Sequence, residues 1–381
     1  MNDYILKFKL NSSVITPFDA DTIFGHICWA IRFNMGNDYL KKFLKDFEEN
    51  PSFLISDAFP ENCLPKPILM DLTSIEIKEL FNDLEQDLKI FYDENFLSNS
   101  NIRNKVNKKD YFLFFLLILK KIRSYKLINK GFLISWLNKF NIKDFTNDLI
   151  RKQFLTSFTV NNNENLNFKP IPDIEIQTTE VMHNRIDRIY LSTSDQNGMQ
   201  GALFSQNETF YCVKNSNAVF DVYLRVFDES CIDLLKNSFL YIANDGFGKD
   251  KSTGRGSLEL YDNKNILVKI NDFNNLDGNY FLSLSPFISS QSFEKIFYDL
   301  KTKYGKVYMP IDEKFTSNIN GNFNPFKKPI IMFTTGSVYK PLNNNNKKIK
   351  SQVIGTLLQD IAYDKSIKHY AFSYPININI L

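Results

Sequence analysis

The sequence has few of the residues that build metal sites and disulfide frameworks. Its 381 residues include only three histidines and four cysteines. The cysteines, Cys28, Cys63, Cys212 and Cys231, lie far apart and form no CxxC pair. Because structural zinc needs clustered thiolate or imidazole ligands, we expect no metal site and no cofactor. The thiols are expected to stay reduced.

Long apolar runs are also missing. The longest, Tyr111 to Leu119, has nine residues, less than half of the roughly 20 that a membrane-spanning helix needs. The opening Met1-Asn2-Asp3-Tyr4 contains an acid and leads into an alternating pattern, unlike a signal peptide. These features predict a cytoplasmic protein without a membrane partner, and the high Asn, Lys, Ile and Phe usage suggests a prokaryotic source.

Glycine is scarce but concentrated in one place. Four of the 14 glycines lie between Gly246 and Gly256, interleaved with basic residues, after an amphipathic helix and before a short strand. Glycine allows backbone N–H groups to approach an anion, and cations neutralise phosphate. The helix–loop–strand order excludes a nucleotide P-loop. We therefore predict a phosphate-backbone cradle, with a plain glycine hairpin as the alternative. Its residues are Gly246, Gly248, Lys249, Lys251, Ser252, Thr253, Gly254, Arg255 and Gly256.

Charge is nearly balanced overall and segregated along the chain. The formal net charge is +3, which excludes a histone-like polycation. Residues 71–94 hold eight acids and two lysines, residues 95–143 eleven basic residues and one acid, and residues 314–359 seven lysines and no acid. Such segments predict patches that meet a polyanion or a charged protein, with solvated surfaces as the alternative for each.

Hydrophobic periodicity predicts an α+β protein. Alternation at 3–11, helical spacing at 20–33 and an apolar run at 53–56 predict a strand, a helix and a strand. Acidic Asp19 and Asp21 are expected to cap that helix rather than to bind metal. Residues of about 72–158 form a helical insertion, in which the run 112–119 is expected to be buried core rather than a partner groove.

After the insertion, strand-like segments, a helix at 230–243, the glycine loop and a strand at 257–261 complete a βαββαβ order. From residue 280 strands recur, with a helix expected at 292–300. We therefore predict two ferredoxin-like (RRM-like) domains. The first spans 1–265 and carries the insertion and the glycine-rich loop 246–256, and the second spans 275–381.

Several short motifs occur in an order that resembles a known family. They are residues 19–25, 56–60 with 64–67, 183–188, the glycine loop, 333–339 and 369–372. Together they are similar to the RAMP subunit of type III-A (Csm) CRISPR effector complexes that caps the 5′ end of the CRISPR RNA. Residues 72–158 match no motif of that family.

The resemblance implies an RNA-binding protein that does not cut RNA. It would hold the repeat-derived 5′ handle of the CRISPR RNA beside the large signalling subunit and the backbone RAMP subunit, and meet target RNA only indirectly. The glycine loop would grip handle phosphates, and residues 183–203 would form a projecting β-hairpin. The residues implied at the RNA there are His183, Asn184, Arg185 and Arg188. Acidic Asp250 departs from a wholly basic-polar loop.

Two other functions remain open at this point. The first is a metal-independent CRISPR RNA-processing endoribonuclease, with His26 as the general base that activates a ribose 2′-OH, although His26 lies near the apolar stripe of its helix. The second is a structural adaptor whose basic patches meet only protein. Tyr241, Phe247 and Tyr261 flank the glycine loop and are expected either to stack bases or to pack in the core.

Overall fold

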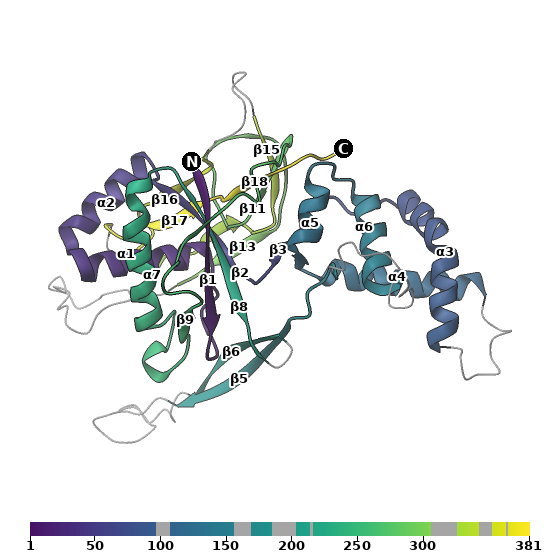
Figure 1. The fold of residues 1–381 in the computed structure, drawn as a ribbon, viewed down its shortest axis with the longest axis horizontal. Coiled ribbons are helices and arrows are strands. Elements are labelled where there is room, and N and C mark those ends of the chain that lie inside the picture. The colour runs from purple at the N-terminus through teal and green to yellow at the C-terminus, as the bar shows by residue number, and fades with distance from the viewer. Residues whose placement is uncertain are drawn as a thin grey trace. The chain divides into compact units, whose positions relative to one another are not determined.

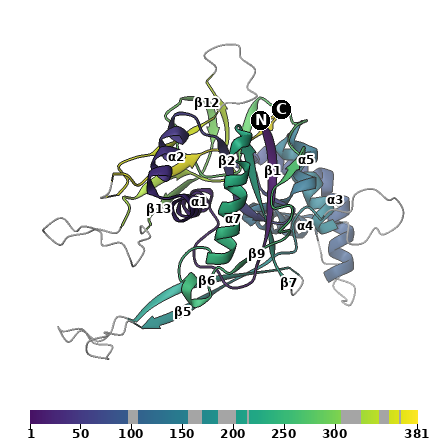
Figure 2. The same ribbon diagram turned by 60° about the vertical axis from the view of Figure 1, so that its left-hand side comes forward.

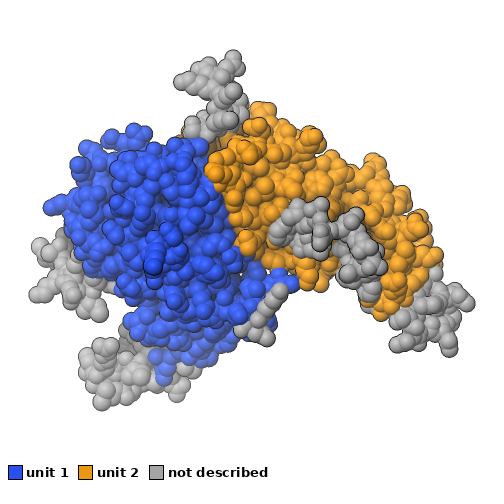
Figure 3. Space-filling view, viewed as in Figure 1, with its two compact units in different colours: residues 1–61, 173–270 blue, residues 62–172, 271–381 orange. Residues whose placement is uncertain are grey.

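The chain folds into two compact units, each made of two separate stretches (Figure 3). The computed structural model describes residues 1–96, 107–155, 169–184, 203–213, 216–305, 326–342, 353–362 and 365–381. Unit 1 consists of Met1–Glu61 and Asp173–Ile270, and unit 2 of Asn62–Pro172 and Asn271–Leu381. The helices of the insertion therefore group with the C-terminal residues. Helices and strands are both abundant, which confirms the α+β class.

Unit 1 is built on a five-stranded antiparallel sheet (Figure 1). The strand order is β10-β1-β8-β2, and β9 also pairs with β1. The elements are β1 (Asn2–Leu10), α1 (Ala20–Met35), α2 (Asn37–Glu49), β2 (Phe53–Pro60), β5 (Glu175–Asn184), β6 (Leu203–Val213), β7 (Ser216–Asn217), β8 (Val219–Val226), α7 (Ile232–Asp245), β9 (Leu258–Leu260) and β10 (Val268–Ile270).

Helices α1 and α7 pack against each other, as both views show (Figures 1 and 2). The helical spacing predicted for α1 is confirmed, since Ile23, Ile27 and Ile31 are buried. The capping prediction is wrong for Asp19, whose side chain makes no cap hydrogen bond. Instead, the N–H of Ala20 donates to Oδ1 of Asp57, 2.7 Å away, because β2 brings that carboxylate to the helix start. A long-range contact has replaced the local one.

Unit 2 contains the predicted helical insertion. Leu80, Leu84 and Leu88 form one fully buried stripe on α3 (Ser74–Phe96), which confirms their helical spacing. No helix in the described part of the chain is long and apolar enough to span a membrane. The elements up to residue 155 are β3 (Cys63–Pro65), α3 (Ser74–Phe96), α4 (Lys108–Ser124), β4 (Leu127–Asn129), α5 (Lys130–Leu137), α6 (Ile142–Ile150) and a π-helix (Arg151–Leu155).

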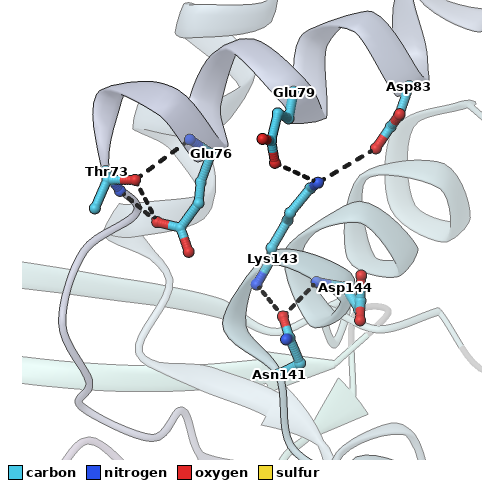
Figure 4. A network of polar contacts seen from close by, with 7 residues as sticks. All are labelled: Thr73, Glu76, Glu79, Asp83, Asn141, Lys143 and Asp144. Atoms are coloured by element: carbon cyan, nitrogen blue, oxygen red, sulfur yellow. Dashed lines mark hydrogen bonds and ion pairs between the residues drawn. The ribbon is translucent and has the colours of Figure 1, made fainter. Parts of the chain in front are cut away.

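The segregated charges of the insertion pair with one another inside unit 2. Nζ of Lys143, on α6, lies 2.8 Å from Glu79 and 3.8 Å from Asp83, both on α3. Figure 4 shows these contacts. Lys108 pairs in the same way with Glu85, and Arg151 with Asp87. The acidic stretch 71–94 is therefore largely neutralised by the basic residues that follow it. A patch that sequence analysis assigned to a partner thus has partners within its own unit.

The rest of unit 2 is made of short strands. They form a four-stranded sheet of order β12-β15-β11-β18 and the pairs β13-β14 and β16-β17. The strands are β11 (Tyr280–Ser283), β12 (Phe293–Phe297), β13 (Leu300–Lys303), β14 (Ile330–Phe333), β15 (Val338–Pro341), β16 (Gly355–Leu358), β17 (His369–Phe372) and β18 (Pro375–Ile378).

The helix predicted at 292–300 is wrong, because this segment forms β12 and the start of β13. Phe293 and Ile296 are spaced as on a helix, yet both pack against one core cluster that includes Phe287 and Tyr339. The pairing of β12 with β15 shifts register between Phe293 and Lys295. A bulge of this kind breaks the two-residue alternation of a strand, so the apolar pattern imitates a helix.

Candidate nucleic-acid interface

The glycine loop begins where α7 ends and closes on itself. The N–H of Gly246 donates to the carbonyl of Ile242, and the N–H of Phe247 to the carbonyl of Gly256, 2.8 Å away. The ring of Phe247 is buried, with its centroid 4.7 Å from that of Phe18 and 4.6 Å from that of His26. The base of the loop is thus part of the core of unit 1.

Three further hydrogen bonds attach the loop to the N-terminal part of the chain. The N–H of Gly248 donates to Nε2 of His26, and the N–H of Lys249 to Oγ1 of Thr16, each at 3.0 Å. The N–H of Gly256 donates to the carbonyl of Ser13 at 2.8 Å. These N–H groups are therefore used for packing in this structure, and an anion would reach them only by displacing a protein acceptor.

The glycines have different physical reasons to be glycine. A Cβ on Gly256 would lie 1.9 Å from the carbonyl oxygen of Phe247, and one on Gly248 would lie 2.6 Å from Cβ of Thr16. Gly256 therefore allows the close approach of another backbone segment, and Gly248 the close approach of the Thr16 side chain. Gly254 has φ +87°, and a Cβ added there would have nothing within 4 Å. It is needed for its backbone conformation alone, at the exposed tip of the loop.

The three cations of the loop all have partners in the protein. Lys251 pairs with Asp245, and Nζ of Lys249 donates to Oε1 of Gln206. Nε of Arg255 donates to Oε1 of Glu208 at 2.9 Å. Glu208 is buried, and the hydrogen bond from Arg255, with another from Ser13, lowers the pKa of its carboxyl. Arg255 therefore acts first as the counter-ion of a buried carboxylate.

Strands β5 and β6, which flank the predicted hairpin 183–203, lie against the glycine loop. Residues 185–202 of that hairpin lie outside the described residues. Strands β5 and β6 pair antiparallel with His183 opposite Phe204 and Val181 opposite Gln206. The rings of His183 and Phe204 stack with centroids 5.4 Å apart, and Nζ of Lys249 lies 6.0 Å from the Phe204 ring. The same face of β6 carries the partners of Lys249 and Arg255, so the structure brings together two segments predicted separately.

The remaining predicted residues divide into exposed ones and ones outside the described residues. Ser252, Thr253 and Gly254 are exposed at the tip of the loop, and Asn184 is exposed at the end of β5. Arg185 and Arg188 lie outside the described residues, as do four of the seven lysines in the stretch 314–359. Gln206, Glu208 and Thr16 were missed because they come from distant parts of the sequence that carry no motif.

The three aromatic residues that flank the loop have different environments. Phe247 is buried and packs in the core of unit 1, which was one of the two alternatives expected for these rings. Tyr241 stacks on Phe33 of α1 with ring centroids 5.8 Å apart. Tyr261 is 64% exposed just after β9. Among these three, Tyr261 is the most exposed ring for stacking a base.

His26 is arranged to position the loop. Its Nε2 accepts the hydrogen bond from Gly248, and burial lowers its pKa to about 4, with a further contribution from nearby Lys251. The ring is therefore neutral at physiological pH, with Nε2 as acceptor. A general base needs that lone pair free, so this geometry does not suit His26 for abstracting a 2′-OH proton. The described residues also hold no group of three or more His, Cys, Asp or Glu that fits a metal ion.

Comparisons with known proteins give structural matches only. No protein-family model and no curated protein matches the chain. The structure is similar to a chain in the crystal structure of a Csm1–Csm4 cassette in complex with AMPPNP, with TM-score 0.47, 14% identity, and 100% of this chain and 99% of that chain covered. It is also similar to a chain of the Csm3–Csm4 subcomplex in the type III-A CRISPR-Cas interference complex, with TM-score 0.46, 17% identity and 100% of both chains covered.

Proposed function

We propose that this chain is a non-catalytic, RNA-binding subunit of a type III-A CRISPR ribonucleoprotein. It holds the repeat-derived 5′ handle of the CRISPR RNA and bridges the large signalling subunit to the backbone RAMP subunits. Target RNA is met only through the guide, and the complex works in the prokaryotic cytoplasm. The order of the motifs along the sequence supports the proposal that the complex is of type III-A. The contacts between residues of unit 1 support the proposed position of the RNA-binding site.

The observation that carries the RNA site is the docking of the glycine loop on the β5–β6 hairpin. Gln206 and Glu208 on β6 hold Lys249 and Arg255, which attaches the glycine loop and its exposed tip 252–254 to the strand that pairs with β5. Hydroxyls, backbone groups and a lysine suit the phosphates and 2′-hydroxyls of a single strand. The site residues of this proposal remain the predicted ones. They are Gly246, Gly248, Lys249, Lys251, Ser252, Thr253, Gly254, Arg255, Gly256, His183, Asn184, Arg185 and Arg188.

Contacts within the chain favour some of the predicted residues over others as direct RNA contacts. Several backbone N–H groups of the loop are already donated inside the chain, and Arg255 and Lys251 face carboxylates. The exposed residues, Lys249, Ser252 and Thr253, are therefore the ones that we propose to touch the handle first. The buried glycines act by holding this tip in place.

We propose a ferredoxin-like fold for each of the two domains. In unit 1 the order β1, α1, β2, β8, α7, β9, with β1 between β8 and β9, supports a ferredoxin-like domain that carries the hairpin as an addition. For the residues from 275 onward, a second ferredoxin-like domain remains a proposal. We also propose that the first domain ends at residue 265 and the second begins at residue 275. Both positions lie close to Ile270, where unit 1 ends.

Substitution of Lys249 tests the proposed RNA contact. We expect Lys249→Ala to weaken binding of a handle RNA at 200 mM salt and to leave it measurable at 50 mM. Removing one phosphate contact lowers the slope of log K against log salt by about one or less. The measurement is a salt titration of handle binding by the full chain.

Lys236 on α7 provides the matched control, because it pairs with Asp233 outside the loop. Lys236→Ala should leave both affinity and salt slope unchanged. Equal losses from the two variants would mean that the loop lysine has no special role. If neither variant changes binding, the lysine-rich stretch 314–359 becomes the candidate for the RNA contact.

A further inference from the structure

Helix α4 of unit 2 is apolar on two opposite faces. One face is buried in the unit, through Tyr111, Phe115, Ile118, Leu119 and Ile122. The other carries Leu113, Leu116 and Leu117, which are 51%, 37% and 65% exposed. The apolar run 112–119 was expected to be buried core, but only one of its two faces is buried. Three neighbouring leucines at i, i+3 and i+4 remain at the surface of one helix.

Lysines frame these leucines at both ends. Lys109 lies one turn before Leu113, Lys120 one turn after Leu116, and Lys121 one turn after Leu117, and all three are exposed. Within the described residues, Lys109 and Lys120 take part in no ion pair, whereas Lys108 on the other side of the helix pairs with Glu85.

No carboxylate of α4 balances this face. The single acid of the helix, Asp110, is half-buried, and its side chain accepts the N–H of Asn107 at 2.9 Å in the capping box of the helix. Its charge is used at the helix start, where an acid is favoured by the helix dipole. On their own helix, the leucines are thus framed by positive charge alone.

We propose that this leucine–lysine face, made of Lys109, Leu113, Leu116, Leu117, Lys120 and Lys121, binds an acidic amphipathic helix of a protein partner. Anchors at i, i+3 and i+4 are the spacing with which one helix packs on another. The lysines at both ends would pair with Asp or Glu next to the apolar residues of the partner helix. RNA fits less well, because single strands are held by stacking on aromatic rings, and leucine has no such ring.

The proposal gives the insertion a role that the RNA site does not need. Its residues all belong to unit 2, and those of the proposed RNA site belong to unit 1. The acidic face of α3 cannot be the occupant in a second copy, since Glu79, Asp83 and Glu85 are already paired with lysines of unit 2. The occupant of this proposal is a different protein, with free carboxylates.

Photo-crosslinking tests the occupant directly. A photoreactive benzoylphenylalanine replaces Leu117 in the full chain, expressed with the large and backbone subunits of the type III-A complex, and the crosslinked peptide is identified by mass spectrometry. We expect one protein partner, crosslinked through a segment with Asp or Glu beside apolar residues. A crosslink to RNA, or none in a complex that contains the chain, would overturn the proposal. The choice of complex rests on the proposed function.

A second measurement does not depend on that choice. The isolated full chain is titrated with a fluorescent amphipathic peptide whose leucines, at i, i+3, i+4 and i+7, are flanked by glutamate. We expect saturable binding that weakens about tenfold or more in Leu117→Glu and falls with added salt. Ile90→Glu is the control, since Ile90 on α3 is 51% exposed, as Leu113 is, and lies outside the face. Absence of saturable binding, or equal binding of a lysine-flanked peptide, would also refute the proposal.

Discussion

Replacement of Gly254 by valine should strip guide RNA from the assembled complex while the chain stays folded. Gly254 has φ +87°, a region that a β-branched residue avoids at a cost of about 1–3 kcal/mol. Nothing lies within 4 Å of the added Cβ, so the strain changes the exposed tip and leaves the core intact. We expect guide content to fall about tenfold or more, measured as RNA per complex after purification.

Two other substitutions bracket this result. Asparagine tolerates the left-handed region, so Gly254→Asn should keep most of the guide RNA. Gly256→Ala places a Cβ 1.9 Å from the carbonyl oxygen of Phe247, so it should open the whole loop and lower the melting temperature as well. A Gly254→Val complex with normal guide content would show that the loop is only a turn.

Loss of the His26 side chain should also release RNA, and it should destabilise unit 1. His26→Ala leaves the N–H of Gly248 without its acceptor and removes the ring that stacks on Phe247. The free energy of unfolding should fall by about 2–4 kcal/mol. His26→Gln is the matched control, because its side-chain oxygen can accept the same hydrogen bond, and it should retain part of the bound RNA.

The same pair of variants separates the binding function from the nuclease. Neither alanine nor glutamine can serve as a general base, so in a nuclease both variants would abolish cleavage of repeat RNA equally. We expect no cleavage by the native chain in EDTA, and unequal RNA retention by the two variants. Specific cleavage lost in both would contradict the positioning role.

The lowered pKa of His26 should make the free energy of unfolding depend on pH. Its value of about 4 lies below the ordinary 6.5, so the unfolded chain binds the proton more readily between these values. The stability that neutral His26 contributes is complete above pH 6.5 and is lost as the pH falls toward 4, by at most about 1.4 kcal/mol per unit. Denaturant unfolding of the native chain between pH 6.5 and 5 should show this slope, and His26→Ala should lack it.

Local patterns were predictable from the sequence wherever local periodicity decides the structure. The alternation that predicts β1, the stripe Ile23, Ile27 and Ile31 of α1, and the helix–loop–strand order around the glycines are all present in unit 1. Each depends on neighbours within a few residues, which the sequence displays directly.

Prediction failed where a distant residue replaced a local one. Asp57 rather than Asp19 supplies the carboxylate at the start of α1, and the bulge in β12 made a strand resemble a helix. Glu208, the partner of Arg255, lies 47 residues away along the chain and belongs to no motif. Tertiary packing decides these contacts, and a single sequence carries no signal for them.

Charge segregation along the sequence also failed to predict which surfaces are left for partners. The sequence places acids in 71–94 and cations just after them, which is typical of patches that meet other molecules. Folding instead pairs Glu79 with Lys143 and Asp87 with Arg151 within unit 2. The charges left for partners are those that remain exposed and unbalanced, such as the lysines of the leucine–lysine face.

The most direct test of the central claim is a crosslinking map of the guide RNA in the assembled complex. The handle nucleotides carry 4-thiouridine, the complex is irradiated, and the crosslinked residues of this chain are identified by mass spectrometry. We expect crosslinks from the handle to the loop tip around Lys249 to Gly254 and to the hairpin near His183 and Asn184. Handle crosslinks confined to residues 314–359, or to other subunits alone, would contradict it.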